Sequence, residues 1–204
     1  MSSQETSHRA PYFKIAKSIS SGFIINYHNQ MKRLIQNEIV WFNEQLNKND
    51  ADENELREIQ DTKDLYLNEY LYFLRSNVFL MLFSHLEEWL EHARRTFSPN
   101  VPKRERASSI GRFSPVLQDL GIDLGKNKNW SFLADCAYVR DCLLHANGRV
   151  SMSKQKDKLK SYIKGKTSGV ILENDRIKIN GGLVQRLSSA TESLMEEIHL
   201  SVST

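Results

Sequence analysis

The chain has 204 residues, of which 40% are hydrophobic and 26% are charged, as expected for one globular domain with a substantial core. This composition excludes a chain that is disordered throughout. The formal net charge of +3 is too small to indicate a nucleic-acid partner by itself, so the local distribution of charge matters more.

Three features of the sequence bear on its compartment. The opening residues, MSSQETSHRAPYFK, are polar and mixed in charge, so no secretory signal peptide is expected. The most apolar window, NVFLMLFSHLEEWL, is interrupted by His85, Glu87 and Glu88, which favours a core helix over a membrane span. Cys136 and Cys142 lie on different sides of one predicted helix and cannot easily form a disulfide. We therefore expect a cytoplasmic protein without a membrane segment.

The first half of the chain predicts two long antiparallel helices. Residues 1–10 are expected to form a flexible tail, and Pro11 suits the first turn of an amphipathic helix that continues to Leu46. The acidic segment NKNDADENE lacks apolar periodicity and predicts a loop. Helical spacing then resumes from Leu56 to Phe97.

The second half predicts shorter elements. The segment SPNVPKRERASSIGRFSP, rich in proline and basic residues, predicts a basic loop. The alternating segment GVILENDRIKIN predicts a small two-stranded hairpin. Helices are expected at three places: Pro115 to Leu120, about Trp130 to Asn147, and Leu183 to about Val202. Together these elements predict a single all-α domain over residues 11–204, with one β-hairpin.

The segment RDCLLHANG, from Arg140 to Gly148, places chemically active side chains at the end of a predicted helix. Asp141 and His145 are four residues apart and share a helical face, and the Arg140 side chain is long enough to reach the same end. In the last turn of a helix, the negative end of the dipole favours imidazolium, so His145 could exchange protons near neutral pH. A basic residue followed by Asn147 and Gly148 is also an ordinary helix terminus. Spacing alone leaves both interpretations open.

RDCLLHANG resembles the R-x4-6-H signature of HEPN domains, compact helical proteins in which a polar residue commonly follows the arginine, as Asp141 does here. The segments SNVFLMLFSHLEEWL and FSPVLQDLGIDLGKNKNWSFLADCAYVRDCLLHANG are similar to the second helix of that family and to the region that leads into its motif. The resemblance spans about Leu56 to Gly148 and implies a HEPN-like helical bundle.

The resemblance also implies a function. Many members are metal-independent endoribonucleases, often toxins or antiviral effectors, in which two subunits place their motifs side by side across a two-fold axis. By this resemblance, Arg140 and His145 would be the catalytic pair, Asp141 a supporting residue and Asn147 an auxiliary RNA contact. A homodimer that acts on RNA is implied, with a possible antitoxin or defence partner protein. Neither a metal nor another cofactor is expected.

The chemistry of RNA cleavage suits these side chains. The 2′-hydroxyl of RNA can attack the adjacent phosphorus, so an enzyme need only assist proton transfer and stabilise the developing charge. His145 would move the proton, and the forked guanidinium of Arg140 would bind phosphate oxygens. Asp141 would orient one of these two side chains.

Basic side chains elsewhere are candidates for holding the RNA backbone, although such residues often form an ordinary solvated surface. The candidates are Lys103, Arg104, Arg106, Lys154, Lys156 and Lys158. Tyr162, which lies among lysines, could stack on a base or pack under its own loop.

Three other interpretations remain open. The same fold could serve as a non-catalytic RNA- or nucleotide-binding scaffold subunit, or as one partner of a two-protein toxin system that is regulated by nucleotidyl modification of this site. His85, Glu88 and His92 on one helix could form a metal-binding stripe. No cysteine ligand or HExxH pattern supports a metal site there, and helix packing also explains these residues.

Overall fold

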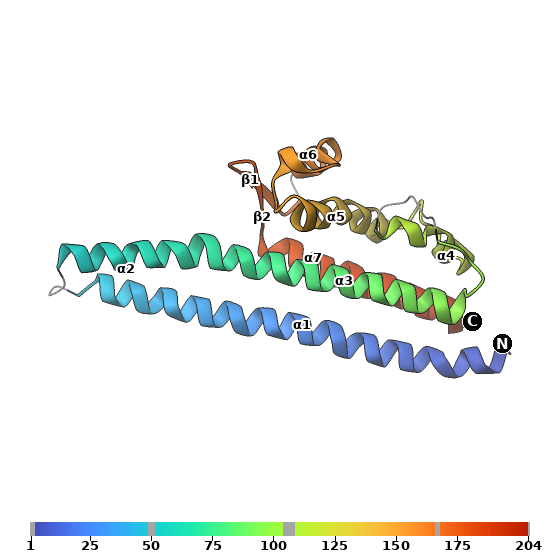
Figure 1. Ribbon diagram of the computed structural model, residues 1–204. Helices are drawn as coiled ribbons and strands as arrows, with labels where there is room; N and C mark the ends of the chain where they lie inside the picture. Colours follow the sequence, from blue (N-terminus) through green and yellow to red (C-terminus); the bar gives the residue numbers. More distant parts are fainter. Residues whose placement is uncertain (1–2, 49–51, 104–108, 166–167, 204) are drawn as a thin grey trace.

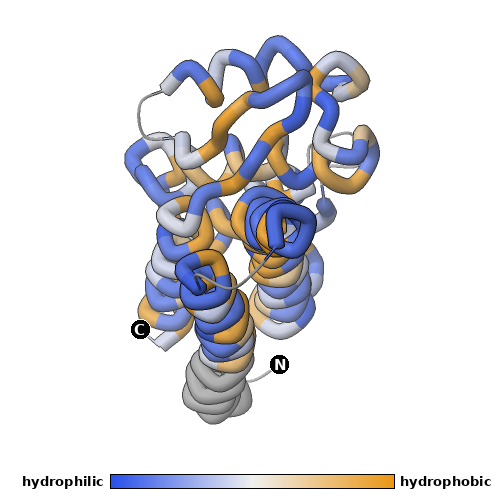
Figure 2. Tube along the Cα trace, turned by 90° about the vertical axis from the view of Figure 1, so that its left-hand side faces the viewer, coloured by the Kyte–Doolittle hydropathy of each residue, from blue (hydrophilic) through white to orange (hydrophobic). Residues whose placement is uncertain are grey.

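The computed structural model describes residues 3–48, 52–103, 109–165 and 168–203, with side chains described from residue 21 onward. Figure 1 shows a long helical hairpin, with a C-terminal helix beside it and a layer of shorter elements on top. Seen end-on in Figure 2, the long helices lie side by side below that layer. The architecture is all-α with a small β-hairpin, as the sequence predicted.

The helical hairpin consists of α1 (Ser3–Leu46) and a nearly continuous second helix formed by α2 (Glu53–Leu65), a π-helical turn (Tyr66–Tyr70) and α3 (Leu71–Phe97). Asp52 caps α2, since its carboxylate accepts hydrogen bonds from the backbone N–H groups of Asn54 and Glu55. These elements confirm the two predicted long helices. The first begins at Ser3 rather than at Pro11. The sequence did not reveal this start, because the polar residues 3–10 carry no apolar pattern.

The remaining elements cover one side of the hairpin. They are two 3-10 turns (Gly111–Phe113 and Val150–Met152), α4 (Ser114–Asp119), α5 (Lys128–His145), α6 (Lys156–Lys164), β1 (Val170–Glu173), β2 (Arg176–Ile179) and α7 (Gly181–Ser203). The helix α6 was not predicted. Its apolar residues Leu159, Tyr162 and Ile163 have helical spacing and pack on the core, but the segment is short and rich in lysine, so the sequence indicated a basic surface stretch instead.

The core lies between α3, α5 and α7, and it is built from the apolar stripe of each helix. Fully buried side chains include Phe79 and Phe83 of α3, Leu133 of α5, and Leu187 and Leu194 of α7. Burying each such side chain contributes about 1.5–3 kcal/mol. No helix within the described ranges is both long and apolar enough to cross a lipid bilayer.

Both ends of α5 are fixed by hydrogen bonds. The side chain of Asn127 accepts a hydrogen bond from the backbone N–H of Trp130 at 2.8 Å and caps the start of the helix. At the other end, Asn147 and Gly148 adopt left-handed conformations, with φ of 48° and 74°. The carbonyl of Gly148 then accepts a hydrogen bond from the backbone N–H of Ile177 at 2.9 Å, which attaches the end of the motif helix to β2.

Among the described glycines, Gly169 is the one at which we expect a substitution by alanine to be most destabilising. Its φ is +71°, and an added Cβ would lie 2.8 Å from the Cβ of Leu183. We expect Gly169→Ala to destabilise the protein by about 3 kcal/mol, because backbone strain adds to the clash. Gly181→Ala is the matched control, since nothing lies within 4 Å of its added Cβ. Urea denaturation measures both variants, and equal midpoints would contradict this account of Gly169.

The two thiols are free and buried. Burial raises the pKa of Cys136 to about 12 and that of Cys142 to about 11, from an ordinary value of 9.0. We expect both to react with iodoacetamide at least about 100-fold more slowly in the native protein than in urea, because the thiolate is the nucleophile. Since the native state retains these protons, the free energy of unfolding should also fall as the pH rises above 9. Rapid alkylation of the native protein, measured by mass spectrometry, would argue against this burial.

Candidate functional site

The three motif side chains line one cavity. Arg140, Asp141 and His145 lie on α5, and the cavity beside them has a volume of about 790 Å³. Its other lining residues come from α3, from the segment before α4, from α5 itself, and from α6 and the turn before it: Glu87, Ser109, Arg112, Tyr138, Lys154, Gln155 and Lys158. The fold thus brings together residues that are far apart in the sequence, and most of the charged groups among them are cationic.

The Arg140 guanidinium is held by two carboxylates. Its Nη1 donates to Oδ1 of Asp141 at 2.8 Å, and its Nη2 donates to Oε2 of Glu87 at 3.3 Å. The Arg140 and Glu87 side chains are only 21% and 14% exposed, so water screens this pair less than it would a surface pair. Asp141 thus contacts the arginine, which is one of the two side chains that it was predicted to orient, whereas Glu87 is a second partner that the sequence did not reveal.

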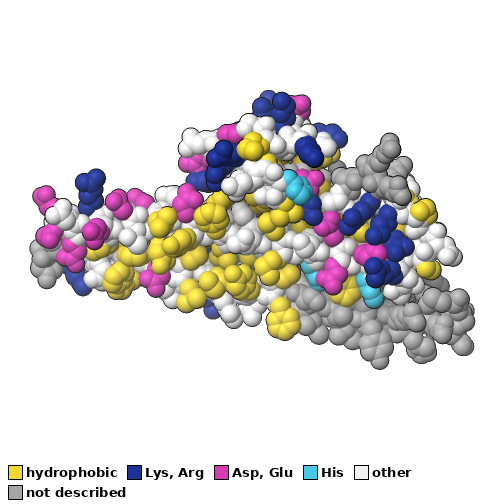
Figure 3. Space-filling model, viewed as in Figure 1, with side chains coloured by type: hydrophobic (Ala, Val, Ile, Leu, Met, Phe, Trp, Pro, Cys, Tyr) yellow, Lys and Arg dark blue, Asp and Glu magenta, His cyan; other side chains and the backbone are white. Residues whose placement is uncertain are grey.

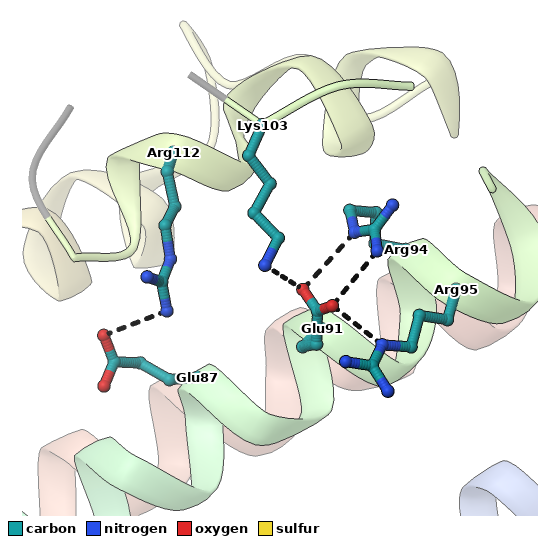
Figure 4. Close-up of polar contacts among 6 residues, drawn as sticks. All are labelled: Glu87, Glu91, Arg94, Arg95, Lys103 and Arg112. Atoms are coloured by element: carbon teal, nitrogen blue, oxygen red, sulfur yellow. Dashed lines mark hydrogen bonds and ion pairs between the residues drawn. The ribbon is translucent and has the colours of Figure 1, made fainter. Parts of the chain in front are cut away.

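Glu87 also faces a second guanidinium. Figure 4 shows Arg112 reaching Glu87 from the segment above α3, with Nη2 of Arg112 3.8 Å from Oε1 of Glu87. Arg112 lies over the ring of Phe113, 4.9 Å from its centroid, and its buried Nε has no hydrogen-bond partner among the described residues. One carboxylate therefore lies between two arginines at the edge of the cavity, where an oxyanion could take its place.

One turn further along α3, Glu91 forms a separate ion-pair network (Figure 4). It binds Lys103 at 2.6 Å, Arg95 at 2.8 Å and Arg94 at 3.1 Å. Hydrogen bonds from Arg94 and then from the other two cations lower the pKa of Glu91 to about 2. The structure thus places Lys103, a predicted RNA contact, on Glu91 and not in the lining of the cavity.

Protonation of Glu91 should weaken this network. Because the folded-state pKa lies below the ordinary value of 4.5, the stabilisation is present above pH 4.5 and is lost as the pH falls towards 2. We expect Glu91→Gln to lower the free energy of unfolding by about 1 kcal/mol at pH 7 and to have a smaller effect at pH 3. Urea denaturation at the two pH values tests this, and an equal effect at both would contradict it.

His145 is the last residue of α5 and is exposed. Within the described part of the chain, its imidazole makes no hydrogen bond to another side chain, so both ring nitrogens are open to a ligand in the cavity. Leu144, immediately before it, is 47% exposed. The imidazole can therefore give or take a proton at the cavity surface.

Only some of the predicted RNA contacts line the motif cavity. Lys154 and Lys158 line the cavity, whereas Lys156 is exposed at the start of α6 outside the lining. Asn147 is exposed in the left-handed turn after α5 and is likewise outside the lining. The other two predicted contacts, Arg104 and Arg106, lie outside the described residues.

The histidines of α3 take part in packing. His85 is buried, and its Nδ1 accepts a hydrogen bond from Nε1 of Trp89 at 3.1 Å. Its Nε2 lies 3.3 Å from Oγ of Ser21 on α1, so both ring nitrogens already have partners. Among the described residues, no group of three or more His, Cys, Asp or Glu side chains could hold a metal ion. His85 thus joins α3 to α1, as the packing interpretation predicted.

Several cavity residues were not identified as site residues from the sequence. Glu87 was noted only as a charge that interrupts an apolar window, although it contacts an arginine 53 positions away. Tyr138 and Gln155 carry no local signal that distinguishes them from their neighbours in the sequence. Arg112 was included in a basic loop, and its proximity to Glu87 could not be read from spacing.

No protein-family model, curated protein or solved structure matches this chain. The resemblance to HEPN domains therefore remains a prediction from the sequence motif, and the geometry of the cavity must support any functional proposal.

Proposed function

We propose that this protein is a metal-independent endoribonuclease that cleaves RNA by attack of a 2′-hydroxyl on the adjacent phosphorus. The main support is that Arg140, Asp141 and His145 line one cavity, together with the cations Lys154 and Lys158. An anionic strand would gain from these cations, and an exposed imidazole beside them can transfer protons.

The proposed reaction follows from the groups present. An imidazole accepts the proton of the 2′-hydroxyl, the O2′–P bond forms, and the bond from phosphorus to the 5′-oxygen breaks. The leaving oxygen takes a proton from an imidazolium, and the products are a cyclic phosphate and a 5′-hydroxyl. Arg140 exchanges its contact with Glu87 for phosphate oxygens, so its charge is placed where negative charge develops.

The proposal includes a homodimer, which would supply a second imidazole beside the first. Figure 3 shows hydrophobic side chains in a band over α1 and the neighbouring α2–α3 helix. On α1, Phe23, Tyr27, Leu34 and Trp41 are between 44% and 71% exposed. They lie within about 40° of one another around the helix axis. We call these four residues the α1 stripe.

The band continues on the next helix, where Tyr70, Phe73 and Met81 are also exposed. Met81 lies about 9 Å along α3 from Glu87, the residue that contacts Arg140. A second copy packed on this band would therefore lie near the motif cavity. Contiguous exposed apolar surface of this kind is typical of interaction sites.

One observation favours a second candidate function. The Arg140 guanidinium already donates hydrogen bonds to Glu87 and Asp141. An arginine engaged in this way would suit a scaffold subunit that binds RNA or a nucleotide without cleaving it. In such a subunit the ion pair persists when RNA binds. Glu87→Gln then strengthens RNA binding, because a carboxylate that repels phosphate has been removed, and no cleavage accompanies it.

The proposed setting is the cytoplasm, as a toxin or an antiviral effector whose activity a partner protein restrains. Expression in a bacterial host tests this role. Wild type is expected to arrest growth and degrade host RNA, whereas Arg140→Ala and His145→Ala are expected to do neither. Equal growth and intact RNA in all three cultures would count against the enzymatic proposal.

Matched RNA and DNA oligonucleotides test the chemistry. We expect the purified protein to cut RNA and to leave the DNA of the same sequence intact, because DNA lacks the attacking hydroxyl. Gel electrophoresis after incubation with excess EDTA measures both reactions and the independence from metal. Cleavage of both substrates would exclude the proposed route.

A further inference from the structure

A second cavity adjoins the motif cavity. It lies between α5, α6 and α7 and has a volume of about 640 Å³. Among the residues that the structure describes, three cationic ones line it, one on each of these helices: Lys128, Lys158 and Arg186. Neither the motif nor the proposed cleavage step uses this cavity.

Cations and aromatic rings are paired along its wall. The guanidinium carbon of Arg186 lies 4.3 Å from the ring centroid of Phe132, so the guanidinium lies close over the ring. Nζ of Lys158 lies 5.4 Å from the ring centroid of Tyr138. A guanidinium that lies against a ring on one side can receive a nucleobase on its other side, which is a common way for proteins to hold unpaired bases.

Tyr162 closes one side of this cavity. Its hydroxyl donates a hydrogen bond to the carbonyl oxygen of Ser168 at 2.8 Å, and its ring packs against the core. Tyr162 is thus held in place by this hydrogen bond and by the core, and it forms one wall of the cavity.

Among the described residues that line this cavity, Asp135 is the one with an acidic side chain. Partial burial raises the pKa of this carboxyl group from its ordinary value, so the ionised form gains from any donor that enters the cavity. Its carboxylate would repel phosphate but would accept hydrogen bonds from the exocyclic amine of cytosine, adenine or guanine. Uracil carries no such amine.

The two cavities adjoin each other along one face of α5. Tyr138 and Lys158 line both of them. Asp135, Tyr138, Asp141 and His145 follow at intervals of three or four residues and therefore share that face. Asp135 and His145 are about 15 Å apart along the helix axis, which is the length of a short stretch of single strand.

We infer that the second cavity is a subsite for one base of single-stranded RNA, flanking the linkage bound in the motif cavity. The base stacks on Arg186, Asp135 selects a base with an exocyclic amine, and Lys128 and Lys158 bind the adjoining phosphates. This inference rests on the proposed ribonuclease function, because the subsite is defined by its place beside the cleaved linkage.

Substrate length provides the kinetic test. A dinucleotide fills the motif cavity alone, whereas a hexanucleotide also reaches the second cavity. We expect Arg186→Ala to lower kcat/KM for the hexanucleotide about tenfold more than for the dinucleotide, because one stacked base is lost. The matched control is Arg57→Ala, since Arg57 is an exposed arginine on α2 outside both cavities. An equal effect of Arg186→Ala on both substrates, or an effect no larger than that of Arg57→Ala, would overturn the subsite.

A binding experiment separates this inference from the proposed function. Fluorescence anisotropy measures the affinity of a labelled hexanucleotide for His145→Ala, and then for His145→Ala with Arg186→Ala. We expect the second substitution to weaken binding about tenfold. If the wild type cuts nothing but Arg186→Ala still weakens binding, the cleavage proposal fails and a base-binding cavity remains. If the wild type cuts RNA and Arg186→Ala changes neither binding nor kcat/KM, the subsite alone fails, and absence of binding by every variant removes both.

Base preference gives a further readout in the same assay. His145→Ala should bind a hexanucleotide of cytosines more tightly than one of uracils, and Asp135→Ala should reduce that difference. Preferences that are equal with and without the Asp135 carboxylate would overturn its assigned role.

Discussion

Replacing His145 with alanine should lower the rate of RNA cleavage by about 10²–10⁴-fold, the usual contribution of a general acid or base. The side chain is exposed at the end of α5 and makes no contact on which the core depends, so the variant should unfold at the same urea concentration as the wild type. Single-turnover cleavage of a labelled RNA measures the rate.

His92→Ala is a suitable control for this experiment. His92 is also an exposed histidine, but it lies on α3 outside the motif cavity and packs edge-on against Trp89. The control should cleave RNA at nearly the wild-type rate. If His145→Ala did the same, His145 would not be the proton-transfer group, and the cavity would be at most a binding site.

Two charges on the α1 stripe should abolish both dimerisation and cleavage. Leu34 and Trp41 are 57% and 50% exposed, so replacing them with glutamate leaves the fold of one copy intact. In a dimer packed on this stripe, the new carboxylates would be buried without partners, at a cost that a helix interface cannot offset. We expect a monomer that cleaves RNA at least about 100-fold more slowly, because the second imidazole is lost.

The matched control adds the same two charges elsewhere on α1. Gln36 and Asn43 are exposed, have the same seven-residue separation and lie on another side of the helix. Their double replacement with glutamate should leave both dimer and activity intact. Light scattering after size-exclusion chromatography measures the mass. A Leu34 and Trp41 double variant that dissociates yet cleaves at the wild-type rate would show that one copy suffices.

Much of the fold could be predicted from the sequence, because apolar periodicity and turn residues are local signals. The spacing of apolar residues revealed the long helices, and the turn at Asn174 and Asp175, both with positive φ, matches the predicted hairpin. The helix α6 was missed because only Leu159, Tyr162 and Ile163 of its nine residues are apolar, which is a short signal among lysines. Local patterns therefore predict most elements, whereas α6, whose local signal is short, becomes evident only from its packing in the structure.

The candidate site was predictable only in part. The order of Arg140, Asp141 and His145 along one helix follows from spacing, and the structure brings all three to one cavity. The contact of Arg140 with Glu87 depends on how α3 packs beside α5, which no local pattern encodes. Lys103 illustrates the converse, because its charge suggested an RNA contact but tertiary packing pairs it with Glu91.

The chemical ends of the RNA fragments provide the most direct measurement of the central claim that a 2′-hydroxyl is the nucleophile at this cavity. Mass spectrometry of the fragments from wild-type protein should show 2′,3′-cyclic phosphates and 5′-hydroxyls, and neither should form with Arg140→Ala or His145→Ala. Fragments that end in 3′-hydroxyls and 5′-phosphates would mean that water attacked instead, which would contradict the proposed mechanism.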